Sequence, residues 1–170
     1  PGAHDHCELV SGALHRLDLN GGSTEPIAGT PEVWARNQGG LLDLAVLAGR
    51  EDPLWLYLTY SKPDGNGNAA TAIARTRLGQ DRLENWQELL VTRSVTGTGR
   101  HFGSRIAFDD SGHLFFSVGD RGERPNGQDL STHAGSIIRL NTDGTVPADN
   151  PFVSRRGLPE IWSYGHRNPQ

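Results

Sequence analysis

A chain of 170 residues can bury one hydrophobic core, and its 22 glycines, 10 prolines and lack of methionine predict many short strands joined by turns. The net charge of -4 comes from interspersed acidic and arginine side chains without a basic stripe, so we expect no nucleic-acid partner. Cys7 stands alone, which excludes an internal disulfide and a cysteine metal cage. No apolar run reaches the roughly 18 residues of a membrane span, and no segment has the pattern of a signal peptide.

The first organising feature along the chain is a repeat. The segments 13–17 (ALHRL), 72–76 (AIART) and 136–140 (SIIRL) are alike, and their arginines are 59 (75 − 16) and 64 (139 − 75) residues apart. The motifs PEVW at 31–34 and PEIW at 159–162 form a second echo, 128 residues apart (159 − 31). We therefore expect a structural unit of roughly 60 residues to recur.

Each repeat unit is predicted to hold about four strands. Strand-like apolar runs at 54–60 and 113–118 begin about one period apart, and the turn sequences DSG at 110–112 and TDG at 142–144 are typical of connections between antiparallel strands. A β-sandwich is the alternative, but it gives no reason for a fixed long period. The sequence thus predicts an all-β fold of propeller type, with about three blades of four-stranded antiparallel sheet across residues 1–170. Since the smallest usual rings have about four blades, the rest of the ring lies outside this chain or comes from a second copy.

A histidine in a glycine-rich segment is the first candidate for chemistry. His101 lies in 96–105 (TGTGRHFGSR), just before an apolar strand. The glycines suggest a phosphate loop, but the Gly-Lys-Ser/Thr ending and a following helix pattern are missing. Histidine on a loop of this kind is well suited to take a proton from an alcohol, while the alternative is a surface turn residue.

An aspartate follows the next strand. Asp120, in 118–122 (VGDRG), is placed to hold the imidazole of His101 in one tautomer and to stabilise the imidazolium. The alternative is an aspartate that only makes the turn before Gly122.

Two polar segments complete the candidates. Residues 162–170 (WSYGHRNPQ) offer Arg167, whose guanidinium can clamp a carboxylate or quinone oxygen, and Asn168, which adds an oriented amide. Gln38 lies at a glycine-rich turn before a buried run. For all three the alternative is a polar loop between blades.

Five segments in this order resemble the glucose/sorbosone dehydrogenase family, and specifically its aldose sugar dehydrogenase branch. In the soluble glucose dehydrogenase branch an aspartate typically precedes the catalytic histidine, whereas Arg100 stands here, which favours the aldose sugar branch. The matching segments are 38–43 (QGGLLD), 101–105 (HFGSR), 119–122 (GDRG), 140–152 (LNTDGTVPADNPF) and 164–170 (YGHRNPQ).

The resemblance implies a six-bladed propeller that binds pyrroloquinoline quinone (PQQ), usually with calcium, and oxidises aldoses at C1 to lactones, with the hydride passing to PQQ. It implies that His101 is the general base, that Asp120 orients it, that Arg167 and Asn168 contact the cofactor, and that Gln38 lies near cofactor and sugar. No metal ligand is predicted in this chain, because the calcium ligands are expected mostly outside it. The family also suggests a periplasmic or secreted protein.

Other classes of function stay open from the residues alone. One is a non-catalytic propeller that binds partners with its face, and another is a metal-dependent propeller lactonase. We also expect self-association, because a set of about three blades exposes sheet faces that neighbours normally cover.

Overall fold

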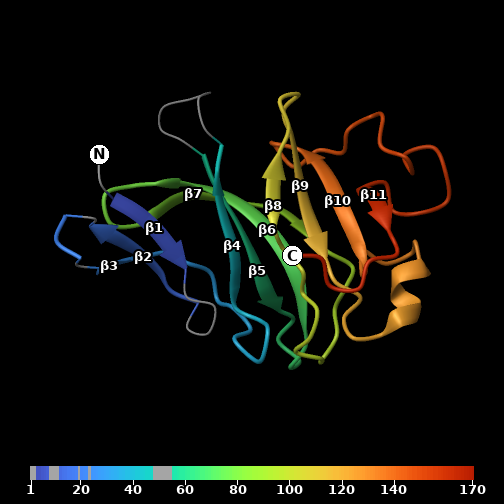
Figure 1. Cartoon of the computed structure of the whole chain (residues 1–170), viewed down its shortest axis with the longest axis horizontal. Coiled ribbons are helices and arrows are strands. Elements are labelled where there is room, and N and C mark those ends of the chain that lie inside the picture. Colours follow the sequence, from blue (N-terminus) through green and yellow to red (C-terminus); the bar gives the residue numbers. More distant parts are fainter. Residues whose placement is uncertain (1–2, 8–11, 19, 23, 48–54) are drawn as a thin grey trace.

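The computed structural model describes residues 3–7, 12–18, 20–22, 24–47 and 55–170. They form three antiparallel sheets that follow one another along the chain and lie side by side (Figure 1). The described residues contain no α-helix, only a 3-10 helix, η1 (Arg124–Gln128). The strands of the first sheet are β1 (Ala3–Cys7), β2 (Leu14–Asp18) and β3 (Thr24–Ile27), those of the second are β4 (Leu41–Val46), β5 (Trp55–Pro63), β6 (Ala69–Leu78) and β7 (Leu83–Val91), and those of the third are β8 (Ile106–Phe108), β9 (His113–Val118), β10 (Ser136–Asn141) and β11 (Ile161–Tyr164).

The predicted repeat is confirmed at the level of strands. The arginine-bearing segments form β2, β6 and β10, and β6 and β10 are the third strands of their sheets. The two apolar runs form β5 and β9, the second strands, although residue 54 lies outside the described residues. Four strands per unit holds for the second and third sheets, whereas the first sheet has three strands among the described residues.

The second echo is wrong as a sign of structural equivalence. Residues 31–34 lie in the connection before β4, the first strand of its sheet, whereas 159–162 run into β11, the last strand of its sheet. The two motifs share local sequence but not a place in the repeat.

Two apolar cores hold the three sheets together. Leu14 and Ile27 of the first sheet pack in one cluster with Leu58 of the second. On its other face, the second sheet contributes Tyr57 to a cluster with Phe116 and other residues of the third sheet. The second sheet is therefore covered on both faces, which explains why β5 reads as a continuous apolar run instead of an alternating one.

One edge of the sheets gathers the connections that carry the candidate residues. The connections 28–40, 64–68, 92–105 and 119–135 lie together along the lower edge in Figure 1. Backbone hydrogen bonds link them: Gln38 N donates to Gly99 O at 3.0 Å, and His133 N donates to Arg93 O at 3.2 Å. Residues distant in sequence thus meet on one face.

Candidate active site

A hydrogen-bonded pair, His101 and Asp120, joins two of these connections. The Nδ1 atom of His101 is 2.6 Å from Oδ1 of Asp120. The His101 side chain is 14% exposed and that of Asp120 is 3% exposed. A buried carboxylate and an imidazole that still reaches the surface are what a general base and its orienting acid require.

The aspartate is fixed from several sides. Its Oδ1 also accepts the N–H of Gly122 at 2.8 Å, and its carbonyl oxygen accepts Nδ2–H of Asn126, in η1, at 3.0 Å. Both interpretations of Asp120 therefore hold, because it makes the turn before Gly122 and also binds the histidine.

The carboxylate determines which imidazole nitrogen can act. Because an ionised Asp120 can only accept, Nδ1 of His101 carries the proton, which leaves Nε2 with a lone pair. The pair can thus remove a proton from a hydroxyl group and stabilise the resulting imidazolium.

Gln38 and Asn168 both contact the connection that carries His101. The Oε1 atom of Gln38 accepts the backbone N–H of His101 at 2.7 Å, and Oδ1 of Asn168 accepts the N–H of Gly103 at 3.2 Å. Both side chains line a cavity of about 250 Å³. The remaining lining residues are Leu42, Phe102, Gly103 and Gln170.

Arg167 joins this group through its backbone. Its carbonyl oxygen accepts the N–H of Asp120 at 2.7 Å, while its side chain is exposed and is not part of the cavity lining. The structure thus brings together His101, Asp120, Gln38 and Asn168 by their side chains, with Arg167 alongside.

Sequence reasoning missed the role of Ser117, a buried residue of β9. Its hydroxyl accepts the N–H of Ser104 at 2.6 Å and that of Arg105 at 3.2 Å, and it donates to the carbonyl oxygen of Pro169 at 2.8 Å. One hydroxyl therefore ties the His101 connection to the segment that holds Asn168. The signal in the sequence was a single small polar residue within the apolar run HLFFSV.

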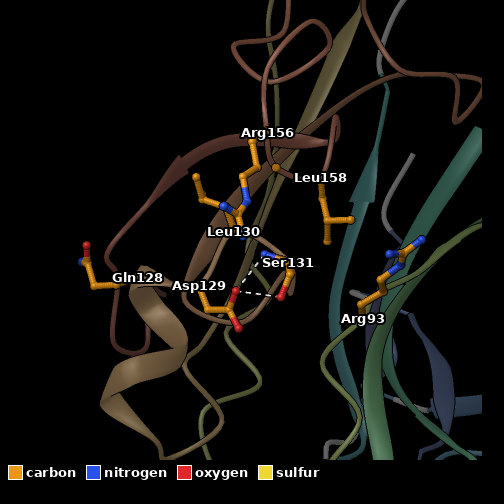
Figure 2. A pocket seen from close by; sticks show the side chains of 8 residues that line it. Arg93, Gln128, Asp129, Leu130, Ser131, Arg156 and Leu158 are labelled. Atoms are coloured by element: carbon orange, nitrogen blue, oxygen red, sulfur yellow. Dashed lines mark hydrogen bonds between the residues drawn. The ribbon is translucent and has the colours of Figure 1, made fainter.

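A second cavity, of about 540 Å³, lies between the loop after β7 and the connections that precede and follow β10, and none of the five predicted site residues lines it (Figure 2). Its carboxylate, Asp129, accepts hydrogen bonds from the backbone N–H of Ser131 at 2.9 Å and from its hydroxyl at 2.7 Å. We place the active site at the smaller cavity because Phe102 and Gly103, which follow His101, line it together with Gln38, which accepts the backbone N–H of His101. The lining of the larger cavity is Arg93, Gln128, Asp129, Leu130, Ser131, Arg156, Gly157 and Leu158.

Among the described residues, no group of three His, Cys, Asp or Glu side chains is arranged to hold a metal ion. In the same part of the chain, no helix has the length and apolar character needed to cross a membrane.

Comparison with known proteins gives a family match. The family model for glucose/sorbosone dehydrogenase matches residues 8–170. The chain belongs to the glucose/sorbosone dehydrogenase family. As a member of this family it shares the propeller fold, and its three sheets are three of the blades.

Among relatives in the family, an aldose sugar dehydrogenase is more similar in sequence to this chain than a quinoprotein glucose dehydrogenase is. Aldose sugar dehydrogenase YliI of Escherichia coli (strain K12) is 38% identical over 165 residues, which cover 95% of this chain and 44% of that protein. Quinoprotein glucose dehydrogenase B of Acinetobacter calcoaceticus is 27% identical over 191 residues, covering 96% and 39%. The crystal structure of the soluble aldose sugar dehydrogenase from Escherichia coli in the apo-form matches with a TM-score of 0.90 at 37% identity, covering 96% of this chain and 48% of that chain. This member of the glucose/sorbosone dehydrogenase family therefore spans about half the length of the relatives it matches.

Proposed function

We propose that this chain carries the proton-abstracting part of a quinoprotein aldose dehydrogenase, which oxidises the C1 hydroxyl of an aldose to a lactone with PQQ as the hydride acceptor. The observation that carries this proposal is the 2.6 Å contact between His101 and a buried Asp120, next to a cavity lined by carboxamides and an aromatic ring. Family membership supports it.

The donor groups around the cavity fit a planar cofactor rich in carboxylates. The carbonyl oxygens of Gln38 and Asn168 are used by backbone N–H groups, so the groups these side chains can turn to a ligand are NH₂ donors. The exposed guanidinium of Arg167 suits a carboxylate through paired hydrogen bonds. We therefore propose that these three residues bind PQQ.

The calcium ion implied by the resemblance belongs to the same proposal. Because the described residues form no cluster of three candidate ligands, calcium would take its oxygen ligands mostly from other parts of the protein. A periplasmic or secreted location is likewise proposed from the family, and fractionation of cells that express the full protein tests it.

In the proposed reaction the protein supplies position and a base. His101 Nε2 takes the proton of the C1 hydroxyl while C1 gives up its hydrogen with two electrons, so that the C–O single bond becomes the lactone carbonyl. Asp120 stabilises the imidazolium that forms and keeps the ring in place. PQQ, when bound, supplies the electron acceptor.

The test is a titration of the chain, and of the full protein that contains it, with PQQ and calcium, followed by dye-linked oxidation of several aldoses. We expect His101→Ala to lower kcat by about a hundredfold to ten-thousandfold. The matched control is His113→Ala, since His113 begins β9, at the end of that strand away from Asp120, and is hydrogen-bonded to Asp109. Equal rates for wild type and His101→Ala would refute the base. Hydrolysis of lactones with a divalent metal and no quinone would establish a lactonase, and partner binding without any turnover would establish a binding module.

A further inference from the structure

Arg121, the residue after Asp120, is the bulkiest fully buried side chain among the described residues, with 0% exposure. Its hydrogen-bond acceptors in this part of the chain are four backbone carbonyl oxygens and no carboxylate. The distances are 3.3 Å from Nε to Ser94 O, 2.6 Å from Nη1 to Arg100 O, 2.9 Å from Nη2 to Thr98 O and 3.4 Å from Nη2 to Ala69 O.

Burying a cation of this kind costs desolvation free energy, so we ask which contacts require an arginine here. Desolvation lowers the pKa of Arg121 to about 10, so the guanidinium still carries its charge at neutral pH. An apolar side chain of similar volume would fill the same space without the desolvation penalty. What such a side chain lacks is a fork of donors that holds several carbonyl oxygens in fixed places.

The groups that Arg121 holds lie on both sides of His101. Arg100 O is bonded to its Nη1 atom, and the ring of Phe102 stacks on the guanidinium with the ring centroid 3.5 Å from Cζ. The neighbours of His101 are therefore tied to the neighbour of Asp120. This makes a second link, parallel to the His101–Asp120 hydrogen bond.

The backbone of this region needs such a link. His101 has φ 54° and Arg121 has φ 60°, a left-handed conformation that side chains other than glycine adopt only when the surroundings enforce it. Three of the four carbonyl contacts of Arg121, to Ser94, Thr98 and Arg100, lie in the 92–105 connection and provide that enforcement.

We propose that Arg121 is a positioning residue for the His101 base. It fixes the connection between β7 and β8 so that the imidazole stays hydrogen-bonded to Asp120. The structural part of this inference stands on the contacts of Arg121 alone, and its consequence for turnover rests on the proposed function.

The first test reads the His101–Asp120 bond without any activity. In wild type, the hydrogen-bonded Nδ1 proton of His101 is expected as a slowly exchanging, far-downfield proton NMR signal, assigned by its loss in His101→Gln. Arg121→Lys keeps the charge but loses the fork, and we expect it to abolish or broaden this signal while the remaining spectrum stays dispersed. Arg139→Lys is the matched control, because Arg139 is a buried arginine (5% exposed) that bonds to Asp149 and Asn150 instead, and the signal should persist there. A signal unchanged in Arg121→Lys overturns the proposal.

The second test uses kinetics of the PQQ-loaded full protein. Arg121→Lys should lower kcat by about tenfold or more, with the KM for sugar and the Kd for PQQ changed less than about twofold. In a His101→Ala background the same substitution should cause no further loss, because its effect passes through His101. Losses that multiply in the double variant, or that fall mainly on KM, contradict a positioning role.

Phe102→Leu is a second variant that tests the proposal if Arg121→Lys misfolds. It removes the ring from the guanidinium while leaving all four carbonyl bonds. We expect a weaker and broader Nδ1 proton signal and a severalfold lower kcat, again dependent on His101. If wild type shows the NMR signal but no PQQ-dependent oxidation, the proposed function fails while the positioning of His101 by Arg121 is still judged by NMR.

Discussion

The backbone N–H of Asp120 donates to the carbonyl oxygen of Arg167 at 2.7 Å. This bond joins the end of β9 to the segment after β11, so the orienting acid and the proposed cofactor-binding arginine are held together by main-chain atoms. The Arg167 side chain itself is exposed. Backbone position and side-chain chemistry can therefore be separated at this residue.

Replacing Arg167 with alanine should weaken PQQ binding without unfolding the protein. The main-chain bond to Asp120 does not need the guanidinium, whereas a carboxylate of the cofactor loses its charge-assisted partner. We expect Kd for PQQ to rise by about tenfold or more and Tm to stay unchanged. Absorbance titration measures the first and calorimetry the second. Arg124→Ala, at an exposed arginine of η1, serves as the control, and an equal loss of affinity there would show that only general charge matters.

Asp120→Asn should reduce turnover more than binding. Asparagine keeps the size of the side chain but offers a neutral amide, so the imidazolium loses its charged partner. The amide also no longer holds the imidazole in the tautomer with its proton on Nδ1. We expect kcat to fall by about a hundredfold or more, with Kd for PQQ nearly unchanged. Single-turnover reduction of the bound cofactor measures this, and a variant that retains wild-type kcat would remove Asp120 from the mechanism.

Gly119→Ala should disturb His101 directly. A Cβ at this position collides with the carbonyl oxygen of His101 and lies 2.7 Å from its Cβ. Because two backbone segments would have to separate, we expect a loss of about 1 to 3 kcal/mol in unfolding free energy together with lower kcat. Denaturant unfolding and the dye assay report on the two effects. Gly97→Ala is the matched control, since its new Cβ meets only the end of the Asn68 side chain, at 3.0 Å. Equal behaviour of the two variants would show that the site tolerates the shift.

Stability should fall in mild acid because of His133. Burial lowers the pKa of this histidine, which outweighs the hydrogen bond to Glu160 that raises it, and the charge of Arg93 lowers it further. Its Nδ1 accepts the N–H of Arg93 at 2.9 Å, so protonation also removes an acceptor.

The sign follows from the two protonation states of His133. In the unfolded chain a histidine takes up its proton at about pH 6.5, and His133 in the folded protein does so at lower pH. Stability is therefore complete above that value and is lost as pH falls below it. Between about pH 7.5 and about pH 5, Tm of wild type should drop more than Tm of His133→Gln, which does not titrate. Parallel curves would assign the acid sensitivity to other groups.

Self-association of this chain stays a prediction. Trp162 (42% exposed) and Tyr164 (46% exposed) present apolar surface on β11. Sedimentation should show concentration-dependent dimers that Trp162→Ser weakens. Val153→Ser, at an exposed residue of the connection before β11, is the control. A monomer at every concentration would contradict the prediction.

The sequence predicted the strands well where packing repeats and poorly where it does not. Arg16, Arg75 and Arg139 recur on β2, β6 and β10, each of which is paired with a neighbouring strand on both sides. The motif at 31–34 was misleading because it lies in a connection, where the repeating strand packing does not constrain the sequence. His101 and Asp120 were predicted as a pair, and their side chains meet.

The supporting contacts of the site were beyond prediction from sequence. Arg121 was noted only as part of the segment 118–122, since nothing in the sequence shows that its guanidinium folds inward onto carbonyl oxygens. The hydroxyl of Ser117 likewise contacts distant backbone atoms, and the ring of Phe102 stacks on the Arg121 guanidinium. Such contacts depend on how connections cross, which the local pattern of residues does not encode.

The burial of Arg121 also sets how the site responds to ionic strength. Dissolved ions weaken attractions between charges that water reaches, such as the half-exposed pair of Lys62 and Glu88. The guanidinium of Arg121 meets neutral carbonyl dipoles where solvent ions do not enter. The geometry around His101 should therefore persist at salt concentrations high enough to disrupt the surface ion pairs of the same blades.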